Sequence, residues 1–160
     1  MRYAEIKLND TANAPGVCVS IWLQGCPHHC KGCFNPETWN FDGGKEFGVQ
    51  EMQSILRGIT ANGVLRNFCI LGGEPLCEEN LFTTAYIIRS VREQYKDTIQ
   101  IYLWSGYTLQ ELKERESNAI NSILDDIDVL IDGRFVESLK NFRLELRGSS
   151  NQVIHYLKNQ

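Results

Sequence analysis

The chain has 160 residues and a formal net charge of −4, with 42% hydrophobic and 22% charged residues. This size and balance are typical of a globular protein with one core, so we expect residues 1–160 to form a single domain. The acidic balance disfavours nucleic acid and anionic lipid as partners. No apolar run approaches the roughly 18 residues that span a membrane, and no secretion signal opens the chain, which predicts a cytoplasmic protein.

Strand and helix patterns alternate along the chain. Runs of apolar and β-branched residues predict strands, and apolar positions at helical spacing predict helices. In chain order we expect strands at 3–8 and 17–23, a helix at 49–60, a strand at 67–71, a helix at 79–95, and strands at 99–104, 129–131 and 153–157. Thr108, followed three residues later by Glu111, has the pattern of a capping box and predicts the start of a helix.

This alternation predicts an α/β fold with a largely parallel sheet covered by helices. A full eight-unit barrel typically needs about 250 residues, which is more than the chain has. We therefore expect a partial, open β/α barrel.

Glycine or cysteine motifs follow three of the predicted strands. They are Gly25-Cys26, Gly72-Gly73-Glu74 and Ser105-Gly106. Ligands of α/β sheets bind at the carboxyl ends of the strands. We therefore expect these three loops to share one pocket.

The strongest signal is a C-x3-C-x2-C motif formed by Cys26, Cys30 and Cys33. Thiolates are the usual ligands of iron–sulfur clusters, and three of them leave one iron of a [4Fe–4S] cluster open to a small molecule. The other cysteines are scattered, at Cys18, Cys69 and Cys77.

Two other interpretations of this motif stay open. A zinc site would need His28, His29 or Cys18 as a fourth ligand, although no second ligand pair appears. An electron-transfer ferredoxin would normally need four cysteines for each cluster. We interpret His28 and His29 as exposed loop residues or as hydrogen-bond donors around the ligands.

The cysteine motif resembles the signature of the radical S-adenosylmethionine enzymes. The resemblance implies that the amino and carboxylate groups of S-adenosylmethionine chelate the open iron. Cleavage of the cofactor by the reduced cluster would then give methionine and a 5′-deoxyadenosyl radical. The family usually has an aromatic residue before the third cysteine, whereas this chain has Gly32 before Cys33 and Phe34 after it. The adenine is therefore expected to pack on Phe34 or on the backbone of this segment.

Gly72, Gly73 and Glu74 resemble the Gly-Gly-Glu motif with which this family binds the amino group of the cofactor. By itself, such a motif is typical of a tight turn. After the next predicted strand, Ser105 is a candidate donor to a carboxylate or a ribose hydroxyl, and Trp104 is expected to pack.

Two polar segments near the C-terminal end also have two interpretations, one structural and one functional. DGRF at 132–135 and RGSSNQ at 147–152 are either surface turns, the first with an Asp–Arg pair, or loops with a function. Arg147 is a candidate to bind the carboxylate of the cofactor or a partner segment.

Together the motifs FNPETW, GGEP, WSGY, DGRF and RGSSNQ follow the cysteine motif in this order. The whole chain thereby resembles the activating proteins of anaerobic ribonucleoside-triphosphate reductase. The resemblance implies an oxidoreductase that makes a glycyl radical on the large subunit of the reductase. Reduced flavodoxin or a similar protein would supply the electron. The cluster and S-adenosylmethionine carry the chemistry, so no catalytic side chain is expected.

Other functions stay open from the sequence. The chain could activate another glycyl-radical enzyme, or act as a small radical synthase of the 7-deazaguanine-forming type. From a different class, it could be a non-catalytic iron–sulfur or zinc module, which would release no 5′-deoxyadenosine.

Overall fold

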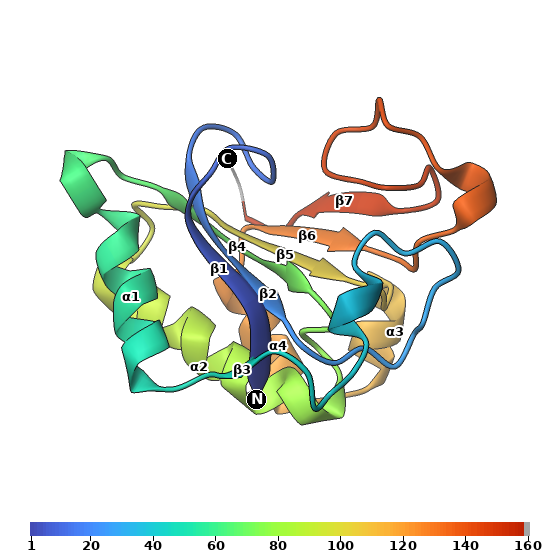
Figure 1. Cartoon of the computed structure of the whole chain (residues 1–160), viewed down its shortest axis with the longest axis horizontal. Helices are drawn as coiled ribbons and strands as arrows, with labels where there is room; N and C mark the ends of the chain where they lie inside the picture. The colour runs from blue at the N-terminus through green and yellow to red at the C-terminus, as the bar shows by residue number, and fades with distance from the viewer. Residues whose placement is uncertain (159–160) are drawn as a thin grey trace.

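The computed structural model describes residues 1–158, and within this part seven strands form one mixed sheet (Figure 1). Their order across the sheet is β3-β1-β2-β4-β5-β6-β7. The strands are β1 (Arg2–Asp10), β2 (Cys18–Leu23), β3 (Lys45–Glu46), β4 (Asn67–Gly72), β5 (Ile101–Ser105), β6 (Val129–Asp132) and β7 (Val153–Tyr156). The α-helices are α1 (Val49–Ile59), α2 (Glu78–Tyr95), α3 (Leu109–Glu114) and α4 (Asn118–Asp126). Short 3₁₀ turns lie at Pro36–Thr38, Ala61–Gly63 and Glu137–Leu139.

The predicted partial β/α barrel is wrong. Only β2, β4, β5 and β6 are parallel neighbours. On one side of them β1 pairs antiparallel with both β2 and β3, and on the other β7 pairs antiparallel with β6. A barrel requires each strand to be followed by a helix that returns the chain in the same direction. Here the connections before β2 and after β6 are loops, so the sheet has antiparallel strands at both edges and few helices.

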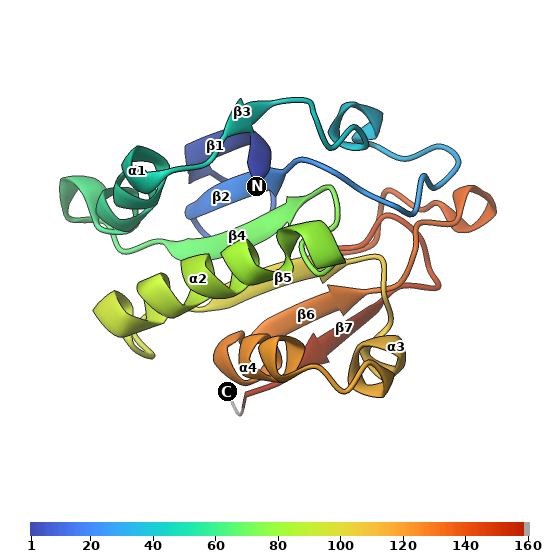
Figure 2. The same ribbon diagram turned by 90° about the horizontal axis from the view of Figure 1, so that it is seen from below.

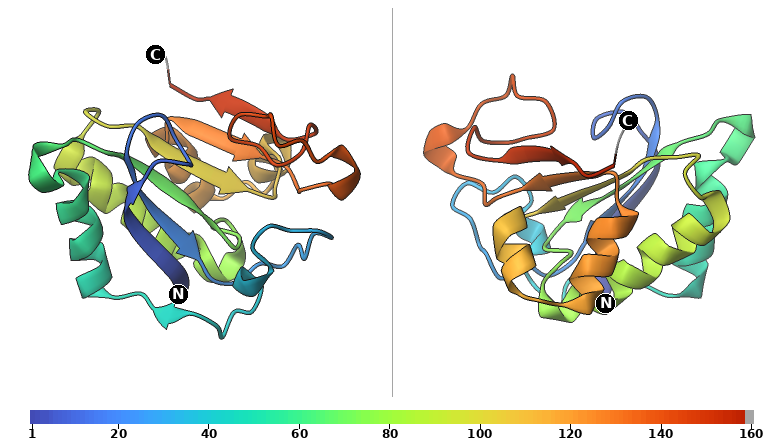
Figure 3. Two further views of the ribbon diagram at one scale, coloured as in Figure 1. Left: turned by 45° about the horizontal axis from the view of Figure 1, so that its top comes forward. Right: turned by 180° about the vertical axis from the view of Figure 1, so that it is seen from behind.

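The α-helices cover one face of the sheet (Figure 2). Between them and the strands lies the larger core, which includes Ile21, Phe68, Ile101, Ile55 and Ile88. The opposite face carries a smaller apolar cluster covered by loops instead. Figure 3 shows the helices on one side of the sheet, and the blue β1–β2 connection and the red loop before β7 on the other.

Most predicted elements are confirmed to within two residues at their ends. The capping box at Thr108 is also confirmed, because the Glu111 amide donates to Thr108 Oγ1 at 3.1 Å and the Thr108 amide donates to Glu111 Oε2 at 2.8 Å. Two further elements, β3 and α4, were not predicted, although Ser117 caps α4 by accepting from the Ile120 amide. Within residues 1–158, no helix is both long and apolar enough to cross a membrane.

The parallel strands determine where the site lies. Because β2, β4, β5 and β6 run in the same direction, their carboxyl ends meet at one edge of the sheet. The segments that follow these four strands begin with Gln24, Gly73, Gly106 and Gly133. These segments build the candidate site.

Candidate iron–sulfur site

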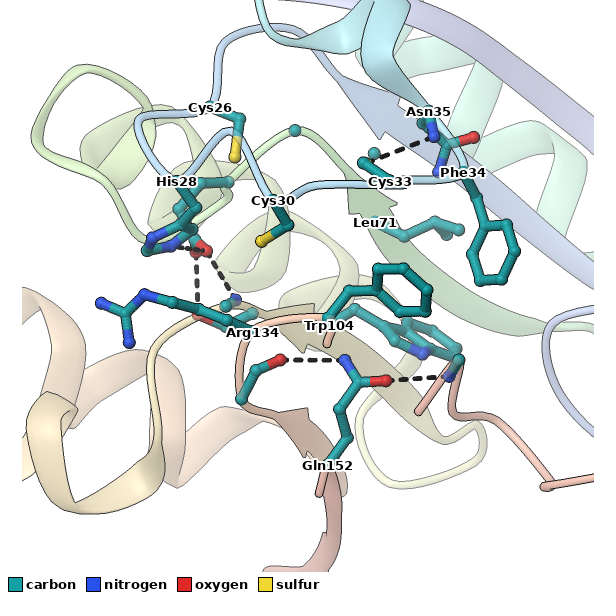
Figure 4. A pocket seen from close by; sticks show the side chains of 18 of the residues that line it. Cys26, His28, Cys30, Cys33, Phe34, Asn35, Leu71, Trp104, Arg134 and Gln152 are labelled. Atoms are coloured by element: carbon teal, nitrogen blue, oxygen red, sulfur yellow. Dashed lines mark hydrogen bonds and ion pairs between the residues drawn. The ribbon is translucent and has the colours of Figure 1, made fainter. Parts of the chain in front are cut away.

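A cavity of about 330 Å³ opens at this edge of the sheet (Figure 4). Its walls come from the segments that follow β2, β4, β5 and β6, the last of which leads into β7, and from the connection between β1 and β2. They include Cys26, Cys30, Cys33, Gly72, Gly73, Glu74, Ser105, Gly106, Arg134 and Arg147. The prediction that the three strand-end loops share one pocket is confirmed.

The three cysteines of the motif lie on one loop and all line this cavity. The Cys33 amide donates to the Cys30 carbonyl at 3.1 Å, and the Asn35 amide donates to Cys33 Sγ at 3.4 Å. Burial raises the pKa of Cys26 to about 11, although the backbone amide of His28 lowers it in part, and burial also raises the pKa of Cys30. These two thiols are therefore protonated at neutral pH without a metal, and ligation must release their protons.

The donor set fits a cluster with three thiolate ligands. Within residues 1–158, no three His, Cys, Asp or Glu side chains converge on a position for a single metal ion. A cubane has a different requirement, because each thiolate binds a separate iron. Cys18 lies at the far end of β2, and a strand of this length spans roughly 16–20 Å. It is therefore too distant to join the three cysteines as a ligand.

His28 follows the second of its two interpretations from the sequence, that of a hydrogen-bond donor beside the cysteine ligands. Its side chain is only 6% exposed, its Nε2 lies 2.9 Å from Glu74 Oε2, and its ring meets Tyr107 edge to face. It is therefore a buried donor and not an exposed loop residue. His29 is exposed and stacks on Trp39 at 4.8 Å between ring centroids.

Glu74 is completely buried and joins three of the loops. Besides His28, its carboxylate accepts hydrogen bonds from the Leu76 amide at 2.9 Å, Ser105 Oγ at 2.8 Å and the Gly106 amide at 2.7 Å. Four donors occupy the carboxylate, and the Ser105 hydroxyl is committed to it. Both side chains therefore hold the wall of the cavity in place.

Gly72 and Gly73 are required by close packing between neighbouring loops. Gly72 has a φ of +103°, and a Cβ at Gly73 would lie 2.3 Å from the Gly25 carbonyl oxygen. The Glu74 amide donates to this same oxygen at 2.8 Å. The loop after β4 is therefore joined directly to the residue before Cys26.

Only part of the segment around the third cysteine lines the cavity. Gly32 does not line the cavity, whereas Cys33 and Phe34 do. The Phe34 ring is half exposed and packs 5.0 Å from Phe135 and 6.4 Å from Phe142. Phe34 and Phe135 line the cavity, and Phe142 packs beside Phe34; these three rings are called the aromatic rim below.

Two arginines also line the cavity. Arg134 pairs with Glu111 at 3.1 Å, so the predicted alternative of an Asp132–Arg134 surface pair is wrong. Asp132 instead accepts from the Leu109 amide at 2.6 Å and lies 2.8 Å from His155 Nε2. Arg147 Nη1 donates to the Gln152 carbonyl at 3.2 Å.

Sequence reasoning missed two contacts of the cysteine loop. The pairing of His28 with Glu74 joins residues 46 positions apart and has no local signal. The Asn35 amide follows Cys33 by two residues, a spacing that suits an N–H···S bond and could have been noticed.

Comparison with known proteins identifies the class. Residues 12–155 match the family described as a 4Fe-4S single cluster domain. The cavity and its three cysteines therefore belong to a single-cluster iron–sulfur protein.

Several relatives match nearly the whole chain. The anaerobic ribonucleoside-triphosphate reductase-activating protein of Vibrio cholerae is 34% identical over 156 residues, which is 97% of each chain. The protein of this name from Escherichia coli K12 is 33% identical over 159 residues, covering 99% of this chain and all of the relative. That of Enterobacteria phage T4 is 30% identical over 152 residues, covering 95% and 92%. The chain belongs to the family of anaerobic ribonucleoside-triphosphate reductase-activating proteins.

Proposed function

We propose that this chain activates an anaerobic ribonucleoside-triphosphate reductase by producing a glycyl radical on its large subunit. The observation that carries the proposal is the single cavity in which three cysteines meet the loops after β4, β5 and β6. The names of the full-length relatives support this reductase as the target.

The proposed ligands of the [4Fe–4S] cluster are Cys26, Cys30 and Cys33. S-adenosylmethionine is proposed to lie between the open iron and the loop after β4. There the carbonyl oxygens of Gly72 and Gly73, which line the cavity, are proposed to accept hydrogen bonds from its amino group. The segment Gly32–Phe34 is proposed to contact the adenine.

A cluster held by Cys26, Cys30 and Cys33 would supply one electron for the reductive cleavage of S-adenosylmethionine to methionine and a 5′-deoxyadenosyl radical. That radical would supply the means to remove a hydrogen atom from the glycine.

The protein's own contribution is to hold these groups and to exclude water. The His28–Glu74 contact fixes the cysteine loop against the loops after β4 and β5. Lys31 and Glu137, 3.5 Å apart, join the same loop to the segment after β6. The aromatic rim restricts water at one side of the cavity. A segment of the partner carrying the glycine is proposed to complete the enclosure, as lids do in other enzymes.

The test is anaerobic reconstitution with iron and sulfide, followed by addition of S-adenosylmethionine, the reductase and reduced flavodoxin, which is the proposed electron donor. We expect 5′-deoxyadenosine by chromatography and a glycyl doublet by electron paramagnetic resonance. The doublet should vanish when the candidate glycine of the reductase is changed to alanine. A cluster-loaded protein that releases no 5′-deoxyadenosine would contradict the proposal. Cleavage without a glycyl signal, accompanied by turnover of a small heterocycle, would identify a synthase.

A further inference from the structure

Arg147 has a buried donor with no acceptor. Among the side-chain atoms of residues 1–158, Arg147 Nε is a buried nitrogen that lacks a hydrogen-bond partner. The Nη1 of the same guanidinium donates only to the backbone carbonyl of Gln152. A buried N–H group left unpaired is costly. Because Arg147 lines the cavity, a bound ligand is the natural source of the missing acceptor.

The other charged side chains of the cavity wall already have partners. Glu74 is saturated by four donors, and Arg134 is paired with Glu111. Arg147, by contrast, forms no ion pair with any carboxylate in the described part of the chain. The cavity therefore presents one cation whose charge is not balanced from within the protein.

The backbone around Arg147 is held from both sides. On one side, Trp104 Nε1 donates to the Leu146 carbonyl at 2.7 Å. On the other, the Gly148 amide donates to Gln152 Oε1 at 2.8 Å, and Gln152 Nε2 donates to the Gly133 carbonyl at 2.9 Å (Figure 4). The arginine is thus fixed to the ends of β5 and β6 and is not part of a free surface loop.

We propose that the Arg147 guanidinium binds the carboxylate of S-adenosylmethionine, an inference that rests on the proposed function. A guanidinium presents parallel N–H donors that match the two oxygens of a carboxylate, and such charge-assisted pairs are strong. The carboxylate is the one anionic group of this cofactor. Arg147 and the Gly72–Gly73 backbone would then bind the two ends of the amino acid moiety from different loops.

The experiment compares S-adenosylmethionine with its decarboxylated analogue, which lacks only this carboxylate. Equilibrium dialysis under anaerobic conditions gives the dissociation constants for the reconstituted protein and for Arg147→Gln. We expect Arg147→Gln to bind S-adenosylmethionine about 10- to 100-fold more weakly, the range for a hydrogen bond to a charged group. Its affinity for the analogue should stay within about 2-fold of the unmodified protein's, because the lost contact is absent there.

Arg143→Gln is the matched control, because Arg143 is an exposed arginine of the same loop and does not line the cavity. It should bind both ligands as the unmodified protein does. Arg147→Lys keeps the charge without the planar fork and should bind S-adenosylmethionine with intermediate affinity. Iron content and thermal unfolding establish that each variant is folded and loaded. If Arg147→Gln does not fold, Arg147→Lys takes its place in the comparison of the two ligands.

Equal losses for both ligands would overturn the assignment, as would unchanged affinity for S-adenosylmethionine. Unchanged cofactor affinity together with a lost reductase complex would assign Arg147 to the partner segment instead. If the loaded, unmodified protein binds neither ligand, the proposed function fails, and this inference fails with it.

Discussion

Cys77 provides an internal comparison for the three cysteines of the cavity. It is buried, and its Sγ donates to the Glu74 carbonyl at 3.1 Å, but it does not line the cavity. Burial raises its pKa to about 12. It therefore remains a protonated thiol at neutral pH and stays a packing residue.

We expect alanine at Cys26, Cys30 or Cys33 to abolish the cluster, because each thiolate holds a different iron. Cys77→Ala should keep a normal cluster and lose only a little stability. Iron content and visible absorbance after anaerobic reconstitution measure the effect. A normal cluster in the Cys30→Ala variant, or none in Cys77→Ala, would show that the ligands are assigned wrongly.

The four hydrogen bonds that Glu74 accepts predict that this side chain contributes to the stability of the protein. Glu74→Gln replaces one acceptor oxygen with an NH₂ group that must face existing donors. The variant should lose about 1–3 kcal/mol of unfolding free energy, the usual cost of an unsatisfied buried group. Urea denaturation of the metal-free protein measures the loss. Glu93→Gln, at an exposed position of α2, is the control and should change stability by less than about 0.5 kcal/mol. Equal stabilities of the two variants would contradict the role given to Glu74.

Among the structural elements, the loop from 133 to 152 is joined to β5 through a tryptophan of that strand. The bond from Trp104 Nε1 to the Leu146 carbonyl holds a residue with a left-handed φ of 58°. Trp104→Phe removes this bond and keeps an aromatic ring on the sheet. Hydrogen–deuterium exchange within 134–150 should become faster, while iron content stays near normal. Trp22→Phe is the control, since the Trp22 indole makes no hydrogen bond to the loop, and it should leave exchange in the loop unchanged. Faster exchange spread equally over α1 and α2 would instead indicate general destabilisation.

For the whole molecule, the one-sided arrangement of helices predicts where the reductase binds. The cavity opens among loops at the carboxyl ends of the strands, and α1 and α2 lie over the opposite face from the 133–152 loop (Figure 3). Binding of the reductase should slow hydrogen exchange in residues 26–34 and 134–148 and leave α1 and α2 unaffected. Protection centred on α1 and α2 would place the partner on the helical face and contradict this prediction.

The sequence predicted the elements and the location of the site well, because both depend on local signals. Apolar spacing identified β4 and α2, and the residues after each strand carried the glycines and cysteines of the cavity. The barrel was predicted wrongly because sheet closure depends on how β1 and β7 pair with distant strands. Local periodicity does not report the direction of such pairings.

Two features of the site that the sequence does not show depend on distant contacts in the same way. The burial of His28 follows from Glu74, and the isolation of Arg147 Nε follows from a loop that folds back over β5. Neither contact has a signal among the residues next to it in the sequence.

The position of the cysteine loop along the chain has a consequence for biosynthesis. Cys26, Cys30 and Cys33 are synthesised before Glu74, Arg134 and Gln152, which complete the walls around them. At about 5–20 residues per second, translation leaves these thiols without their cavity for several seconds. Iron delivered in that interval would meet a flexible peptide with neither the His28 contact nor the aromatic rim. Productive loading of the metal is therefore expected only once Glu74, Arg134 and Gln152 have been made and the walls of the cavity have folded around the three thiols.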